Sequence, residues 1–138
     1  MGIGTVGDFY VHNRQASGCT VVTIGGELDV ATAPVLRSHL DELISEGHAR
    51  LVLDLAALEF LDASGVGVLA RAMGRARAQD GWTRLTHASP QVRRVLRITH
   101  LAEALPEFPS TAQALSGDRG STPAHLSPVG GYSSPSNA

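Results

Sequence analysis

Near the middle of this 138-residue chain, residues 54–69 read Asp54-Leu55-Ala56-Ala57-Leu58-Glu59-Phe60-Leu61-Asp62-Ala63-Ser64-Gly65-Val66-Gly67-Val68-Leu69. The pattern predicts a buried strand, a short acidic turn and then the start of a helix, with Ser64 at the junction. A hydroxyl there lies beside backbone N–H groups without intrahelical partners, at the positive end of the helix dipole. An anion is stabilised at such a position, so Ser64 is chemically suited to carry a phosphate.

Strand-like and helix-like segments alternate from Phe9 to Leu115, which is typical of an α/β domain. A turn is expected at residues 14–18, and Gly25-Gly26 should end the second strand. The expected strands are residues 9–12, 20–24, 51–55, 83–86 and, at an edge, 105–108. Helices are expected to begin at Thr32-Ala33-Pro34, Ser64, Ser89-Pro90 and Thr111, where capping residues and first-turn prolines favour a helix start.

Three parts are predicted along the chain. Residues 1–8 form an N-terminal extension, and residues 9–115 form one domain with a sizeable core. Residues 116–138 are rich in Gly, Ser and Pro with few apolar side chains, which predicts a disordered tail.

Composition excludes several classes of function. The net charge of −2 disfavours nucleic acid or an anionic membrane as the main partner, and no apolar run is long enough to span a bilayer. The first twenty residues lack the basic and apolar regions of a secretory signal, so a cytoplasmic location is expected. One cysteine, Cys19, permits neither an intramolecular disulfide nor a thiolate metal cluster. The absence of lysine excludes an ordinary P-loop, and the histidine spacing suggests no metal site.

Three segments, in the right order and at the right intervals, closely resemble the STAS domain (sulfate transporter and anti-sigma factor antagonist), specifically its antagonist branch. They are Gly26-Glu27-Leu28-Asp29 followed by Thr32-Ala33, then Asp54-Leu55 through Asp62-Ala63-Ser64-Gly65-Val66-Gly67, and Ser89-Pro90-Gln91-Val92-Arg93-Arg94-Val95-Leu96 with Leu101. The resemblance implies a single STAS-type domain, with a mixed β-sheet of about four to five strands packed against about four helices.

By the same resemblance, Ser64 is the residue that a partner kinase phosphorylates. Asp29 and Asp62, with Thr32, Ala63 and Gly65, belong to the partner-binding surface around it; Ala63 stands where many relatives have a second serine. The implied partner is an anti-sigma factor that is also a serine kinase using ATP. The unphosphorylated form binds this kinase and releases a sigma factor, and a serine phosphatase resets the phosphorylated form. No cofactor, metal or catalytic residue is implied, and a weak homodimer stays open.

Physical chemistry supports a switch at Ser64. A phosphate adds a charge of about −1.5 to −2 at neutral pH, two residues from Asp62. The helix dipole offsets about 0.3–1 kcal/mol of the repulsion, so the fold should survive. A partner that packs over Ser64 would instead have to desolvate a dianion, at a cost on the order of several kcal/mol unless it supplied cations.

Other interpretations of these residues stay open on the sequence alone. Ser64 could be only the N-cap of its helix, and Asp29 and Asp62 only solvated turn residues. Asp54, inside an apolar strand, is expected to close a structural hydrogen bond. His39 should lie with Glu42 and Glu46 on a solvated helix face, and Arg71 and Arg75 either on a solvated face or against an acidic partner patch.

Two other functions compete with the antagonist. A serine hydrolase needs a G-x-S-x-G elbow, but position 62 is aspartate and the chain is too short for a full hydrolase. The more serious alternative is a constitutive STAS scaffold or a small-ligand module for a nucleotide or lipid, without phospho-switching. It predicts a ligand-dependent melting shift and indifference to Ser64→Ala.

Overall fold

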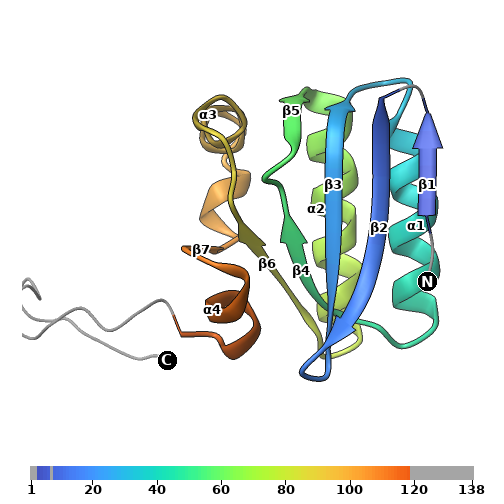
Figure 1. Cartoon of the computed structure of the whole chain (residues 1–138), viewed down its shortest axis with the longest axis vertical. Helices are drawn as coiled ribbons and strands as arrows, with labels where there is room; N and C mark the ends of the chain where they lie inside the picture. Colours follow the sequence, from blue (N-terminus) through green and yellow to red (C-terminus); the bar gives the residue numbers. More distant parts are fainter. Residues whose placement is uncertain (1–2, 7, 119–138) are drawn as a thin grey trace, which may run out of the picture.

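A seven-stranded mixed β-sheet is the centre of the fold (Figure 1). This computed structural model describes residues 3–6 and 8–118. The strands are β1 (Ile3–Val6), β2 (Phe9–Ala16), β3 (Cys19–Leu28), β4 (Arg50–Asp54), β5 (Leu58–Leu61), β6 (Trp82–Thr86) and β7 (Glu107–Phe108). The helices are α1 (Ala33–Ser45), α2 (Ala63–Ala78), α3 (Pro90–Ile98) and α4 (Thr111–Ser116), with a 3-10 helix η1 (Leu101–Glu103). The predicted α/β class with four helices is confirmed.

The sheet has two strands more than predicted. β1 lies within the expected N-terminal extension and pairs antiparallel with β2. β5 occupies most of the predicted acidic turn, because Leu58 and Leu61 are buried and their backbone pairs in parallel with β3. Only Ala56-Ala57 form the turn itself. Of the predicted tail, residues 119–138 lie outside the described part of the chain.

The first hairpin is also longer than predicted. β2 continues to Ala16, and the turn is reduced to Ser17-Gly18, both with positive φ (54° and 76°), as a two-residue hairpin turn requires. β3 runs through Gly25-Gly26 to Leu28, so the expectation that these glycines end the strand is wrong. A Cβ on Gly26 would lie 2.6 Å from the backbone oxygen of Asp8, which explains why glycine is needed for this close approach.

β3 is the central strand and changes partner along its length. Its first part, Thr20–Thr23, pairs in parallel with β4, whereas Gly26–Leu28 pairs in parallel with β5. The register shifts between Gly26 and Glu27, which marks a bulge. From β3 the sheet order continues β4-β6-β7, all parallel. The carboxyl ends of β3 and β5 therefore lie at one end of the sheet, where α1 and α2 begin (Figure 1).

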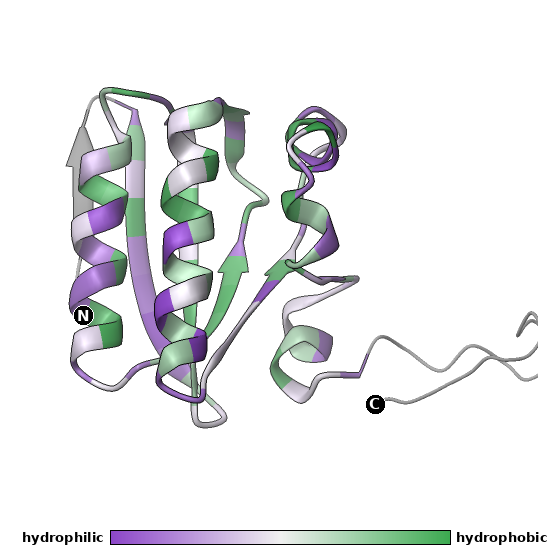
Figure 2. Cartoon of the chain, turned by 180° about the vertical axis from the view of Figure 1, so that it is seen from behind, coloured by the Kyte–Doolittle hydropathy of each residue, from purple (hydrophilic) through white to green (hydrophobic). Residues whose placement is uncertain are grey.

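Helices cover both faces of the sheet. α1 and α2 lie side by side on one face, each mixing hydrophobic and hydrophilic residues (Figure 2), and bury an aliphatic core against the sheet. α4 packs on the other face, where Ala114 belongs to a second buried cluster with Val21, Val52 and Phe108. Thr99, the C-cap residue of α3, is exposed. Among the described residues, no helix combines the length and the apolar character needed to cross a bilayer.

Candidate functional site

The β3–β5 register brings the two predicted loop aspartates together. Leu28 at the end of β3 pairs with Leu61 at the end of β5, and the N–H of Asp62 donates to the carbonyl of Leu28 at 3.2 Å. Asp29 and Asp62 are the next residues after these two strand ends, and both are half-buried. Two carboxylates 33 positions apart in the sequence numbering therefore start neighbouring loops, one before α1 and one before α2.

Asp62, and not Ser64, caps α2. Its backbone is extended, and its Oδ1 accepts the N–H groups of Ser64 at 2.9 Å and Gly65 at 3.2 Å. Ser64 is the second residue of the helix, so the interpretation of Ser64 as an N-cap is wrong. Within residues 3–6 and 8–118, no hydrogen bond of the Ser64 hydroxyl is found. The half-exposed hydroxyl is thus not used to hold the fold together.

A second hydrogen-bonded loop shapes the other side of the site. Oδ1 of Asp29 accepts the N–H groups of Ala31 at 2.9 Å and Thr32 at 3.1 Å. The buried Thr32 hydroxyl accepts the Asp29 N–H at 2.9 Å and donates to the carbonyl of Glu27 at 2.8 Å. Thr32 occupies the N-cap position of α1 as predicted, with Pro34 in the first turn, but its side chain holds the preceding loop instead of capping the helix.

Ala63 and Gly65, the other two predicted partner-binding residues, differ sharply in exposure. Ala63 is exposed at the start of α2. Gly65 is buried, and a Cβ there would lie 2.6 Å from side-chain atoms of both Leu28 and Leu61. Gly65 therefore lets α2 approach the ends of β3 and β5 closely. This close approach fixes the position of the neighbouring Ser64 relative to the two strand ends.

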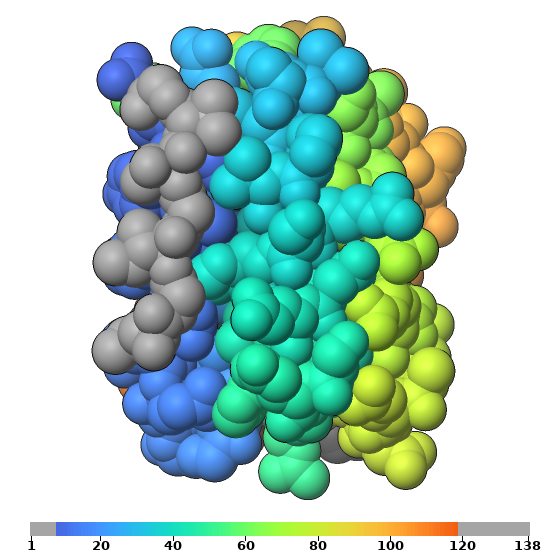
Figure 3. Space-filling model, turned by 90° about the vertical axis from the view of Figure 1, so that its right-hand side faces the viewer, coloured from blue at the N-terminus to red at the C-terminus, as the bar shows by residue number. Residues whose placement is uncertain are grey.

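Ser64 lines a shallow groove of about 330 Å³ between the N-terminal parts of α1 and α2. Figure 3 shows these two helices side by side, α1 in cyan to teal and α2 in green to yellow-green. The residues lining this groove, which we call the Ser64 groove, are Val30, Ala33, Pro34, Arg37, Ser64, Gly67, Val68 and Arg71. The sequence predicted only Ser64 from this set as a site residue. The i, i+3, i+4, i+7 spacing of the four α2 members could have indicated a shared face.

The chemistry of this end of the molecule is mixed apolar and charged. Val30, in the loop after β3, has 74% of its surface exposed, and Phe60 of β5 has 40% exposed. Exposed apolar side chains of this size beside polar ones are typical of protein-binding surfaces. The arrangement therefore suits contact with another protein around Ser64.

An ion-pair cluster joins α1 to α2 just beyond the groove. Asp41 of α1 lies 3.3 Å from Nη2 of Arg71 and 2.5 Å from Nη1 of Arg75, both on α2, and 3.8 Å from Nε of Arg37. Burial alone would raise the pKa of the Asp41 carboxyl, but hydrogen bonds from Arg71 and Arg75 outweigh it and lower that pKa. The two α2 arginines are thus engaged by α1, where the sequence left open a solvated face or an acidic partner patch.

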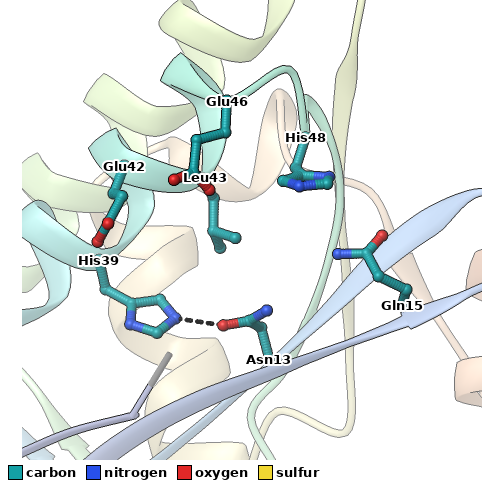
Figure 4. Close-up of a pocket in the computed structure, with 7 residues that line it drawn as sticks. All are labelled: Asn13, Gln15, His39, Glu42, Leu43, Glu46 and His48. Atoms are coloured by element: carbon teal, nitrogen blue, oxygen red, sulfur yellow. Dashed lines mark hydrogen bonds between the residues drawn. The ribbon is translucent and has the colours of Figure 1, made fainter. Parts of the chain in front are cut away.

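His39 lies with Glu42 and Glu46 as predicted, since all three line one pocket, but the prediction of a solvated position is wrong for His39. His39 is half-buried in a separate pocket of about 440 Å³, where its Nε2 lies 2.9 Å from Oδ1 of Asn13 on β2 (Figure 4). Burial lowers the pKa of His39, against an opposing effect from Glu42. Nothing in the sequence indicated that Asn13 pairs with His39, because the two residues lie 26 positions apart.

Among the described residues, no group of three or more His, Cys, Asp or Glu is placed to hold a metal ion.

The expectation for Asp54 is confirmed. Its Oδ1 accepts the N–H of Ala56 at 3.1 Å and lies 3.2 Å from Nδ1 of His87, the residue after β6. The carboxylate therefore fixes the turn that leads from β4 into β5. Asp54 thus helps to position β5, which leads to Asp62, but it does not line the Ser64 groove.

Comparison with known proteins matches this arrangement. The model of the STAS domain matches residues 10–114. The anti-sigma-F factor antagonist RsfB of Mycobacterium tuberculosis is 32% identical over 104 residues, covering 75% of this chain and 84% of that protein. A crystal structure of an anti-sigma factor antagonist from Mycobacterium paratuberculosis superposes with a TM-score of 0.73 at 28% identity, covering 81% of this chain and 95% of that one.

A further solved structure, the anti-sigma factor antagonist SpoIIAA in its unphosphorylated form, has a TM-score of 0.68 at 25% identity. It covers 78% of this chain and 94% of the other. The agreement extends over nearly all of the described sheet and helices. This chain therefore belongs to the STAS domain family, and within it is similar to anti-sigma factor antagonists.

Proposed function

We propose that this protein is an anti-sigma factor antagonist that binds an anti-sigma factor with serine kinase activity while Ser64 is unmodified. Binding releases the sigma factor, and phosphorylation of Ser64 by the bound kinase ends the interaction. A serine phosphatase returns the protein to its binding form. In this proposal the protein acts in the cytoplasm, needs no cofactor and catalyses no reaction itself.

The observation that carries the proposal is that Asp62 caps α2, so the hydroxyl of Ser64 is not needed as the cap. Because the Asp62 carboxylate satisfies the Ser64 and Gly65 N–H groups, the Ser64 hydroxyl is left half-exposed in the groove. A kinase can modify it without breaking a hydrogen bond of the fold. The added charge of about −1.5 to −2 then stands on the surface that the partner must cover.

The proposed partner surface follows from the same geometry. Asp29, Asp62 and Ala63 present polar and small groups around Ser64, and Val30 supplies an exposed apolar contact. Thr32 and Gly65 are buried and contribute indirectly. Thr32 fixes the loop before α1, and Gly65 allows α2 to pack closely against the ends of β3 and β5. A partner that packs on this surface would have to desolvate a phosphate dianion at Ser64, which costs on the order of several kcal/mol without compensating cations.

Capture experiments with variants at Ser64 test the proposal. Ser64→Ala, Ser64→Glu and, as a matched control, Ser38→Glu are immobilised and exposed to extract of the source organism with ATP. Ser38 is exposed on α1 and does not line the Ser64 groove. Ser38→Glu therefore adds the same charge as Ser64→Glu but outside the proposed partner surface. We expect Ser64→Ala and Ser38→Glu, but not Ser64→Glu, to retain an ATPase of the histidine-kinase fold. Equal capture by all three would contradict the switch and favour a constitutive scaffold.

Mass spectrometry of the wild-type protein after the same incubation gives a direct second readout. We expect one phosphate, on Ser64, and none on Ser64→Ala. Phosphate on another serine or threonine in place of Ser64 would overturn the assignment of the site.

A further inference from the structure

We propose that Arg37 and Arg71 form a binding site for the phosphate monoester of phosphorylated Ser64, across the Ser64 groove. The inference rests on the proposed phosphorylation and adds to it the ligands that receive the phosphate. In the phosphorylated protein, the phosphate would then fill the Ser64 groove. Phosphorylation would change the shape of the partner-binding surface as well as its charge.

Helix geometry places Ser64 within reach of Arg71, whose guanidinium contacts Asp41 in this structure. Ser64, Gly67, Val68 and Arg71 lie on one stripe of α2 and all line the groove. Seven residues of helix span about 10 Å, and long helical side chains lean toward the helix N-terminus, which here is the Ser64 end. Gly67 lies between them, and a Cβ there would meet no atom within 4 Å, so the path along the stripe is open.

Arg37 lines the groove from α1. Its side chain is 55% exposed, and its Nε is 3.8 Å from Asp41, a loose contact that a stronger anion can replace. A phosphate on Ser64 would therefore have one guanidinium on each wall of the groove. Arginine is well matched to this ligand because its planar fork of donors can bind phosphate oxygens in a bidentate manner.

To bind the phosphate, Arg37 and Arg71 would have to leave Asp41, where Arg75 can stay. Three guanidinium groups share this carboxylate, and the shortest contact, 2.5 Å, is made by Arg75, which does not line the groove. The contacts of Arg37 and Arg71 are longer, at 3.8 and 3.3 Å. Asp41 would thus keep its closest partner when the other two arginines turn to the phosphate, and the helix pair would stay joined.

The nearby acidic groups oppose the phosphate only in part. The Asp62 carboxylate is turned toward the Ser64 and Gly65 N–H groups, and the Asp29 carboxylate toward its own loop. Two arginines can offset this like charge, since opposite charges within hydrogen-bonding distance favour the ionised form of a group. The phosphate would thereby be held in the Ser64 groove, over the apolar lining residues that a partner would contact.

Phosphorus NMR on protein with phosphoserine installed at position 64, chemically or by genetic encoding, tests the site without any kinase. The second pKa of phosphoserine is ordinarily about 6. Its surroundings here include Arg37, Arg71, Asp29, Asp41 and Asp62. We expect that pKa to be higher in the Arg37→Gln, Arg71→Gln double variant than in the wild type by at least about half a unit.

Arg75→Gln is the matched control, because it removes a guanidinium from the same helix and the same Asp41 cluster outside the groove. It should raise the phosphate pKa by much less than the double variant does, because both groove arginines remain, and each single groove variant should raise it by part of the full effect. Equal pKa values in the wild type, the double variant and Arg75→Gln would overturn the phosphate site. That result would leave the kinase-capture test untouched, and a failed capture test would equally leave the NMR result standing.

Discussion

The carboxylate of Asp62 accepts a hydrogen bond from the backbone N–H of Ser64 at 2.9 Å, and so caps the helix that contains Ser64. Two adjacent tasks are thereby divided between two residues. Asp62 stabilises the start of α2, and Ser64 keeps a side chain that the fold does not use. The proposed phosphorylation of Ser64 would therefore leave the cap of α2 in place.

Removing the cap should cost stability, whereas removing the hydroxyl should not. Asp62→Ala is expected to lower the free energy of unfolding by about 0.5–2 kcal/mol, because two N–H groups lose their acceptor. Ser64→Ala should change it by less than about 0.5 kcal/mol, as for a surface substitution. Urea unfolding of both variants and of Asp62→Asn, which keeps a capping oxygen, checks this. A larger loss for Ser64→Ala than for Asp62→Ala would mean that Ser64 is the cap after all.

Three glycines of α2 should respond differently to alanine. Gly67 and Gly74 have open space where a Cβ would lie, so alanine at either should raise the free energy of unfolding by about 0.5–1 kcal/mol. At Gly65 a Cβ would lie 2.6 Å from atoms of Leu28 and Leu61, so alanine should destabilise by about 1–3 kcal/mol. Thermal and urea unfolding of the three variants give the order. Stabilisation by Gly65→Ala would show that α2 does not sit as close to the strand ends as described.

Val30 should contribute to partner binding without contributing to stability. Val30→Ser removes an apolar side chain that is 74% exposed beside the Ser64 groove, so capture of the anti-sigma factor should weaken several-fold. Ile98→Ser is the control, because Ile98 is similarly exposed, at 64%, but lies on α3 and outside that groove. Binding measured by surface plasmon resonance should fall for Val30→Ser alone. Equal loss for both variants would mean that the contact surface is not centred on the Ser64 groove or extends to α3.

His39 should make the protein less stable in mild acid. Burial lowers the pKa of His39 from its ordinary value of 6.5, so below that pH the unfolded chain binds a proton that the folded chain resists. The His39 contribution is full above pH 6.5 and is lost as pH falls toward the lowered pKa. His39→Gln, which keeps a donor for Asn13, should show a smaller drop in the free energy of unfolding between pH 7.5 and pH 5 in urea titrations. Parallel pH profiles for both proteins would refute this.

Local sequence patterns were sufficient for the elements that depend on local chemistry. Thr32 with Pro34 predicted the start of α1, and Ser89 with Pro90 the start of α3, because capping and first-turn preferences act within a few residues. The apolar run that became β4 was equally clear. The position of Ser64 at the start of α2 also followed from the sequence.

Features that depend on distant residues could not be predicted in this way. Asp62 and Ser64 are both good capping residues, and only the extended backbone at Asp62 decides between them. The strand β5 is four residues long and exists because β3 offers it a partner beyond the bulge. The contacts of Asp41 with Arg71 and Arg75 join residues 30 and 34 positions apart, so spacing within one helix could not reveal them.

The bulge at Gly26–Glu27 has a mechanical consequence for the proposed exchange of partners. The loops with Asp29 and Asp62 are anchored to the short β3–β5 pair, whereas the longer β3–β4 pair starts on the other side of the bulge. A distortion imposed at the binding end can therefore relax at the bulge before it reaches the β4 and β6 ladder. The end of the sheet next to Ser64 can then deform on contact while the β4 and β6 ladder keeps its register.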